Sequence, residues 1–185
     1  MLQQHFEEKG EKSLLIPFPD RSTQIGGIIN QYLKQTFSLP DEAVHLLFSA
    51  NRWEMKEKIT QALESGCHVL LDRYAYSGVA YTASKGLSLQ YCMNPDRGLP
   101  RPDVVFFMEM DIQDISERAG FGEEIYEKES FQKKVQEVYC ELEEKDYWVR
   151  VSGKGSREEI HCRVVEESGR VETSRAVERL WEERE

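Results

Sequence analysis

The sequence predicts an α/β fold in which a parallel sheet is flanked by helices. Apolar runs that suit buried strands occur near residues 13, 69, 104 and 148. Segments with helical periodicity separate these runs, and this alternation is typical of parallel strands joined by helical crossovers. With 185 residues, we expect a single domain spanning residues 1–185 with a sizeable hydrophobic core.

Glycines and a serine mark the helix ends in the first half of the chain. The expected elements, in chain order, are the end of a helix at 1–9, a strand at 13–16, a rigid turn at 17–23, a helix at 24–35, one long helix from about 40 to 65 and a strand at 69–71. Gly10 and Gly66 are expected to end helices because glycine adopts the left-handed conformation of a C-terminal cap. Ser22 is expected to cap the helix that follows it.

The second half continues the alternation and adds a candidate flap. The expected elements are a strand at 104–108, a short helix at 112–118, a flap at 119–127, a helix at 129–145, a strand at 147–151, a Gly-rich turn at 152–156, a helix at about 157–167 and a charged tail at about 168–185. Two glycines and three acids between Ala119 and Glu127 suit a mobile segment better than a packed one.

Composition excludes several classes of function. The formal net charge of −10 argues against a nucleic-acid surface, although a few arginines can still form a local pocket for a small anion. The sequence has no apolar stretch of the ~20 residues that cross a membrane, and its N-terminus does not resemble a signal peptide, so we expect a cytoplasmic protein. The four cysteines are far apart and are expected to be buried free thiols.

Asp72 and Arg73 directly follow the apolar run Val69–Leu71. Ligands of open parallel sheets bind beyond the carboxyl ends of the strands, so this acid and this base are expected to project into a site. Ser77 and Gly78 come one turn later, where the missing glycine side chain lets a ligand approach the backbone. A structural ion pair between Asp72 and Arg73 is the simpler alternative.

Three further side chains suit a ligand with a phosphate and a base. Arg21 precedes the helix at 24–35, where a guanidinium and free backbone N–H groups can bind an anion together. Phe48 and Arg52 are four residues apart on one helix, which offers a flat ring for stacking and a donor fork for a carbonyl edge. The alternatives are a solvated loop arginine and a core phenylalanine beside a salt-bridged arginine.

Four motifs stand in order between residues 18 and 103. They are Phe18-Pro-Asp-Arg-Ser-Thr23, Leu46-Leu-Phe-Ser-Ala-Asn-Arg-Trp-Glu54, Asp72-Arg-Tyr-Ala-Tyr-Ser-Gly-Val-Ala-Tyr-Thr82 and Gly98-Leu-Pro-Arg-Pro-Asp103. In order and spacing, they closely resemble eukaryotic-type thymidylate kinases. The resemblance implies a P-loop nucleoside monophosphate kinase fold with a lid at about 118–127. It further implies ATP-dependent phosphorylation of dTMP to dTDP with Mg²⁺, in dTTP synthesis, and a homodimer.

The resemblance also implies roles for individual residues. Contacts with dTMP are implied for Arg21, Phe48, Arg52, Arg73, Ser77, Gly78, Tyr81, Tyr126 and Gln132. Within this set Arg21 and Arg73 resemble the pair that binds the phosphate, and Tyr81 resembles the aromatic residue beneath the deoxyribose. Asp72 and Arg73 are implied as catalytic, with Asp72 also ordering Mg²⁺. Arg118 and Lys154 match positions on the ATP side.

The printed sequence contains no G-x-x-x-x-G-K-[ST] loop, which the resemblance places, after a strand, ahead of the helix at 1–9. We therefore expect neighbouring strands with unpaired inner edges, and negligible turnover with ATP in the absence of this phosphate cradle.

Three hypotheses follow for the function of the chain. The chain is a thymidylate kinase whose sequence starts late, a non-catalytic relative that binds dTMP or a partner protein, or a structural domain whose arginines pair with its acids.

Overall fold

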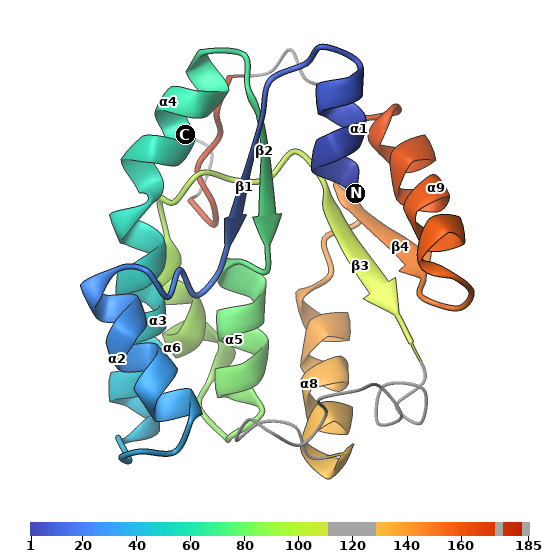
Figure 1. Ribbon diagram of the computed structural model, residues 1–185. Coiled ribbons are helices and arrows are strands. Elements are labelled where there is room, and N and C mark those ends of the chain that lie inside the picture. The colour runs from blue at the N-terminus through green and yellow to red at the C-terminus, as the bar shows by residue number, and fades with distance from the viewer. Residues whose placement is uncertain (111–128, 173–175, 183–185) are drawn as a thin grey trace.

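The computed structural model describes residues 1–110, 129–172 and 176–182, and its elements alternate as the sequence predicts (Figure 1). The helices and strands are α1 (Leu2–Glu8), β1 (Ser13–Pro17), α2 (Gln24–Leu33), α3 (Asp41–Glu54), α4 (Lys56–Glu64), β2 (His68–Asp72), α5 (Ala75–Ala83), α6 (Leu89–Met93), the 3₁₀ helix η1 (Asn94–Asp96), β3 (Val105–Glu109), α8 (Glu129–Leu142), β4 (Trp148–Ser152) and α9 (Arg157–Ser168). The expected helix at 112–118 and the flap at 119–127 lie outside the described residues.

The strands form two parallel pairs. β1 pairs with β2 from Ser13–His68 to Pro17–Asp72, and β3 pairs with β4 in the same sense. Among the described strands, hydrogen bonding is interrupted between β2 and β3, as expected. All four arrows in Figure 1 point the same way, so the carboxyl ends of the strands lie at one edge. The predicted parallel strands flanked by helices are thus confirmed.

The helix predicted as one long element is two helices that meet at Met55. Met55 has φ −95° and ψ −6°, and its N–H donates to the carbonyl of Arg52 at 3.1 Å, which tightens the last turn of α3. Its side chain is buried in the main core cluster. Neither glycine nor proline marks this break, so the sequence pattern could not reveal it.

The cap of α2 is Thr23 and not Ser22. The Thr23 hydroxyl accepts a hydrogen bond from the N–H of Gly26 at 2.9 Å. Ser22 is unavailable because both its N–H and its hydroxyl donate to the carboxylate of Asp20, at 3.0 and 2.6 Å. Because Asp20 accepts both hydrogen bonds of Ser22, the cap of α2 lies one residue further along the chain, at Thr23.

Two segments are more ordered than their sequences predict. The short elements α6 and η1 lie between α5 and β3, where the sequence pattern indicated no element. Near the end of the chain, Leu180 is fully buried, and Arg179 forms an isolated bridge with Pro100. The segment from 176 to 182 therefore belongs to the folded body.

The expectation for the cysteines is wrong in part. Cys92 is buried and Cys67 half-buried, whereas Cys140 and Cys162 are exposed on α8 and α9; all four are free thiols. Among the described residues, no helix combines the length and the apolar character that crossing a membrane requires.

Candidate active site

A cleft of about 400 Å³ opens at the carboxyl ends of β1 and β2. Its walls come from the loop after β1, from the end of α2, from α3, from the end of β2 with α5, and from α8. Nine residues singled out in the sequence line it, namely Arg21, Phe48, Arg52, Asp72, Arg73, Ser77, Gly78, Tyr81 and Gln132. Residues from four separate stretches of sequence thus meet in one cavity, as an active site at this edge of a parallel sheet requires.

Three expected site residues are not placed in this cleft. Lys154 lies in the exposed turn between β4 and α9 and does not line it. Arg118 and Tyr126 fall outside the described residues.

The loop that carries Arg21 is fixed to α3 by the buried side chain of Asn51. The Asn51 amide accepts from the N–H of Asp20 at 2.8 Å and donates to the carbonyl of Asp20 at 3.2 Å. It also donates to the Thr23 hydroxyl at 2.9 Å. The hydrogen bonds from Ser22 lower the pKa of Asp20, which keeps this carboxylate ionised. Arg21 is exposed at the rim of the cleft and donates to the side-chain oxygen of Asn30 at 3.0 Å.

Arg73 is held in a strained backbone conformation at the end of β2. Its φ of +67° lies in the left-handed region, which costs a non-glycine residue about 1–3 kcal/mol and is characteristic of functional sites. Its Nε donates to the hydroxyl of Ser77 at 3.3 Å, and its guanidinium lies 4.5 Å from the centre of the Tyr81 ring. The side chain is thus held by a neutral hydroxyl and an aromatic face, both compatible with binding an anion.

Arg52 is both a donor that faces the cleft and a salt-bridged side chain, so both interpretations of the Phe48–Arg52 pair apply. It lines the cleft, and it also forms a buried ion pair with Asp96, with 2.6 Å between Nη2 and Oδ2. Gly78 lies directly against the guanidinium, because a Cβ atom at this glycine would stand 2.7 Å from Nη2. Phe48 packs against the apolar cluster between α2 and α3 and lines the same cleft.

Tyr81 and Gln132 connect the wall of α5 to α8. The Gln132 side chain donates to the Tyr81 hydroxyl at 3.3 Å, and the ring of Phe131 meets that of Tyr81 edge to face at 6.0 Å. A ligand on Arg73 therefore has an aromatic ring beside it.

Sequence reasoning missed three residues that support this site, namely Asn51, Asp96 and Tyr139. The Tyr139 hydroxyl lies 2.7 Å from that of Ser77, the acceptor of the Arg73 hydrogen bond. Burial raises the pKa of Tyr139, which keeps its hydroxyl protonated at neutral pH. Only Asn51 gave a usable signal, as a member of the Leu46–Glu54 motif.

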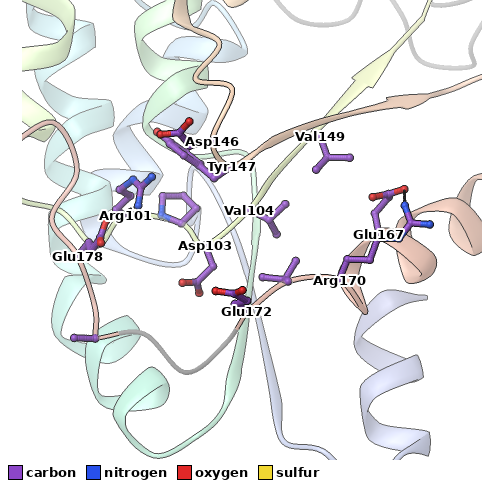
Figure 2. A pocket seen from close by; sticks show the side chains of 13 residues that line it. Arg101, Asp103, Val104, Asp146, Tyr147, Val149, Glu167, Arg170, Glu172 and Glu178 are labelled. Atoms are coloured by element: carbon purple, nitrogen blue, oxygen red, sulfur yellow. Dashed lines mark hydrogen bonds and ion pairs between the residues drawn. The ribbon is translucent and has the colours of Figure 1, made fainter.

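A second hollow, of about 280 Å³, lies at the amino ends of β3 and β4. Figure 2 shows Arg101 beside Glu178 and Arg170 beside Glu167, and each of these is an ion pair. Because acids neutralise both arginines, this hollow lacks the positive charge that a nucleotide phosphate requires. The candidate site is therefore the cleft at the carboxyl ends.

Known proteins share sequence and structure with most of this chain. The family model for thymidylate kinase matches residues 1–164. The chain is 46% identical over 143 residues to thymidylate kinase of Dictyostelium discoideum, covering 77% of this chain and 64% of that protein. Over 151 residues it is 47% identical to thymidylate kinase of Plasmodium falciparum, covering 81% of this chain and 72% of the relative.

The human relative and a solved structure extend the similarity over most of the chain. Human thymidylate kinase is 39% identical over 178 residues, covering 93% of this chain and 84% of that protein. A solved structure of thymidylate kinase from Candida albicans superposes with a TM-score of 0.80 at 36% identity, covering 97% of this chain and 91% of the other. The chain therefore belongs to the thymidylate kinase family, has its P-loop nucleoside monophosphate kinase fold, and is a member of a family of transferases that phosphorylate dTMP.

Proposed function

We propose that this chain binds dTMP in the cleft and transfers the γ-phosphoryl group of ATP to the phosphate of dTMP, forming dTDP and releasing ADP. One observation carries the proposal. The cleft at the carboxyl ends of the strands is lined by Arg21, Arg73, Phe48 and Arg52 together. This set matches the parts of a nucleoside monophosphate, which has an anionic end and a flat base.

The phosphate of dTMP is proposed to bind between Arg21 and Arg73. Two phosphates repel one another, so phosphoryl transfer needs cations that screen the acceptor while the donor approaches. Arg73 is suited to this task because its contacts with the Ser77 hydroxyl and the Tyr81 ring are contacts with neutral groups. Among the described residues, no acid accepts a hydrogen bond from its guanidinium.

The base is proposed to stack on Phe48 and to accept a hydrogen bond from Arg52. Ser77 and Gly78 line the wall between the two ends, and Tyr81 with Gln132 closes the side where the sugar lies. The Tyr81 ring would then restrict the space for a 2′-hydroxyl group. Tyr126 is proposed as a further contact with the nucleoside, and Arg118 and Lys154 as contacts with ATP.

The donor set of the cleft fits Mg²⁺ bound together with nucleotide phosphates. Asp72 is exposed at the end of β2 and lines the cleft. Among the described residues, no group of three or more acids, histidines or cysteines is arranged to hold a metal by itself. Mg²⁺ is commonly bound by one or two carboxylates with phosphate and water, and it neutralises charge on the transferring group. Asp72 is the residue that would hold it.

We further propose a cytoplasmic location and a homodimer. The exposed apolar side chains of Ile28 on α2 and Leu46 on α3, which are 42% and 49% exposed on helices that pack together, support an interface at these helices. Light scattering after size-exclusion chromatography would test the dimer.

Arg73→Ala tests the proposed binding site. Arginine and alanine are both L-residues, so the backbone strain at φ +67° remains, and the substitution removes the guanidinium together with the methylene groups that carry it. Loss of charge-assisted hydrogen bonds worth about 1.5–3 kcal/mol should weaken dTMP binding about 10- to 100-fold in titration calorimetry.

Arg170→Ala is the matched control, because Arg170 pairs with glutamates at the second hollow. Its affinity for dTMP should equal that of the wild type, and equal affinity in Arg73→Ala would contradict the assignment. A coupled ADP-release assay on the wild type then tests turnover. Tight dTMP binding without dTMP-dependent ADP release would mean that this chain binds dTMP but does not itself transfer the phosphoryl group.

A further inference from the structure

Two buried opposite charges lie at the base end of the cleft. Arg52 is 2% exposed and Asp96 is fully buried. The Nε and Nη2 atoms of Arg52 donate to the two carboxylate oxygens of Asp96 at 3.1 and 2.6 Å, the fork-to-fork geometry of a bidentate pair. Arg52 lines the cleft and Asp96 does not, so Asp96 can act on a ligand only through Arg52.

This contact leaves the guanidinium a single orientation. The carboxylate occupies the edge formed by Nε and Nη2. Gly78 closes another side, because a Cβ atom there would stand 2.7 Å from Nη2 and 2.9 Å from Nη1. The donors that remain after pairing, chiefly those of Nη1, are therefore ordered before any ligand binds. Ordering an arginine in advance removes an entropic cost from binding.

Asp96 is itself anchored on two sides. The hydroxyl of Ser49 donates to its Oδ1 at 2.7 Å, and its backbone carbonyl accepts from the N–H of Leu99 at 3.2 Å. The preceding carbonyl, that of Pro95, accepts from the indole N–H of Trp53 at 2.7 Å. These hydrogen bonds hold the carboxylate of Asp96 in one position, and the carboxylate in turn holds the guanidinium of Arg52.

The pairing also changes what Arg52 can recognise. Its charge is balanced by a carboxylate, whereas Arg73 donates to the neutral hydroxyl of Ser77. A balanced guanidinium retains directed N–H donors but attracts an anion less, so it suits a neutral carbonyl group. The charge pattern thus orients a nucleotide with its phosphate at Arg73 and its base at Arg52.

We propose that Asp96 is a positioning residue that fixes Arg52 for reading the base, so that a 4-oxo pyrimidine is bound in preference to a 4-amino pyrimidine. The inference rests on the proposed binding of dTMP in this cleft. A carbonyl oxygen at C4 accepts from the ordered donors, whereas an amino group there presents a donor to a donor.

The test compares dTMP with dCMP by titration calorimetry. Their bases differ at C4 and N3 and in the 5-methyl group of thymine, so the quantity that tests Arg52 is the change in the dTMP-to-dCMP affinity ratio between wild type and variant. Asp96→Asn keeps the shape of the side chain but places an amide NH₂ group against a donor of Arg52. We expect dTMP affinity to fall on the order of 10- to 100-fold, and the dTMP-to-dCMP affinity ratio to fall at least about tenfold.

A charge-conserving variant covers the case in which Asp96→Asn does not fold, since an unpaired buried arginine is strongly destabilising. Asp96→Glu keeps the ion pair and displaces the carboxylate by one methylene, so the affinity ratio should fall here too. Asp41→Asn is the control. Asp41, the first residue of α3, also pairs with a basic side chain, with 2.6 Å between its Oδ1 and the Nζ of Lys85, but it does not line the cleft.

A purely structural role for Asp96 would lower stability in urea unfolding and leave the dTMP-to-dCMP ratio unchanged in each folded Asp96 variant. That result would overturn the inference. Failure of the proposed function has a different signature, in which the wild-type protein itself binds neither nucleotide.

Discussion

His45 is a fully buried titratable side chain on α3. One ring nitrogen, Nε2, lies 2.9 Å from the carbonyl of Cys92, which can only accept, so Nε2 carries the hydrogen. The other, Nδ1, lies 2.9 Å from the hydroxyl of Thr82 and accepts from it in the neutral ring. Burial, and after it the charge of Arg52, lowers the pKa of His45 below its ordinary value of 6.5.

This lowered pKa predicts that the protein loses stability on acidification. Below about pH 6.5 the unfolded chain binds a proton at this histidine that the folded chain does not, so the free energy of unfolding falls as pH decreases. Above that pH both states are neutral at His45, and its contribution to stability is fully present.

Urea unfolding of the wild type and of His45→Gln at about pH 7.5 and 5.5 would measure this effect. The glutamine retains a donor and an acceptor but does not titrate, so its free energy of unfolding should fall less between the two pH values. Equal losses in both proteins would show that His45 is not responsible.

At the residue scale, the sequence revealed the side chains that line the cleft but not those that hold them in place. Arg73 and Ser77 follow a buried strand, and Phe48 and Arg52 share a helical face, so local spacing was sufficient for both pairs. Asp96 contacts Arg52 across 44 positions of the chain, and no local pattern encodes a contact of that kind. The choice between a salt-bridged and a ligand-facing Arg52 was a false alternative, because one guanidinium has enough donors for both.

At the element scale, the start of α2 and the loop that carries Arg21 approach one another at a glycine. A Cβ atom at Gly26 would stand 1.8 Å from the carbonyl oxygen of Asp20 and 2.9 Å from the Cα of Arg21. These are backbone atoms and cannot rotate away. The neighbouring Gly27 has no heavy atom within 4 Å of such a Cβ, which makes the two glycines a matched pair.

We predict opposite effects of alanine at these two positions. Gly26→Ala should lower the free energy of unfolding by about 1–3 kcal/mol or more, because the helix and the loop must separate. It should also weaken dTMP binding, since Arg21 moves with the loop. Gly27→Ala should raise stability by about 0.5–1 kcal/mol, because alanine loses less backbone entropy in a helix.

Urea unfolding with calorimetric titration of dTMP measures both effects in the same samples. Similar stability and affinity in the two variants would mean that the close approach of α2 to the loop does not constrain the site.

Elements whose cause is local could be predicted, and elements whose cause is tertiary could not. The strands appeared as apolar runs, and α8 appeared through the helical spacing of Phe131, Val135 and Leu142. The division at Met55 depends on a side chain entering the core, and the α2 cap depends on Asp20 engaging Ser22. Both follow from contacts that periodicity does not contain.

At the scale of the whole molecule, the segment from 176 to 182 supports the site from a distance. Leu180 donates its N–H to the carbonyl of Leu99 at 2.8 Å and accepts from the N–H of Gly98 at 3.0 Å. Leu99 in turn donates to Asp96, the partner of Arg52. The charged sequence near the end of the chain predicted a tail, yet this segment is joined to Arg52 in the cleft through three hydrogen-bonded steps.

Truncation of Leu180 tests whether this segment is part of the cooperative fold. Leu180 and Leu99 are both fully buried in the main core cluster, so Leu180→Ala removes packed methyl groups and leaves a cavity that the rigid turn at Leu99 cannot fill. We expect the free energy of unfolding in urea to fall by about 2–5 kcal/mol, with a single transition. Val177→Ala, at a side chain 41% exposed in the same segment, should change it by less than about 0.5 kcal/mol. Equal midpoints for the two variants would mean that the segment can detach without unfolding the domain, and Asp96 would then owe its position to Ser49 and α3 alone.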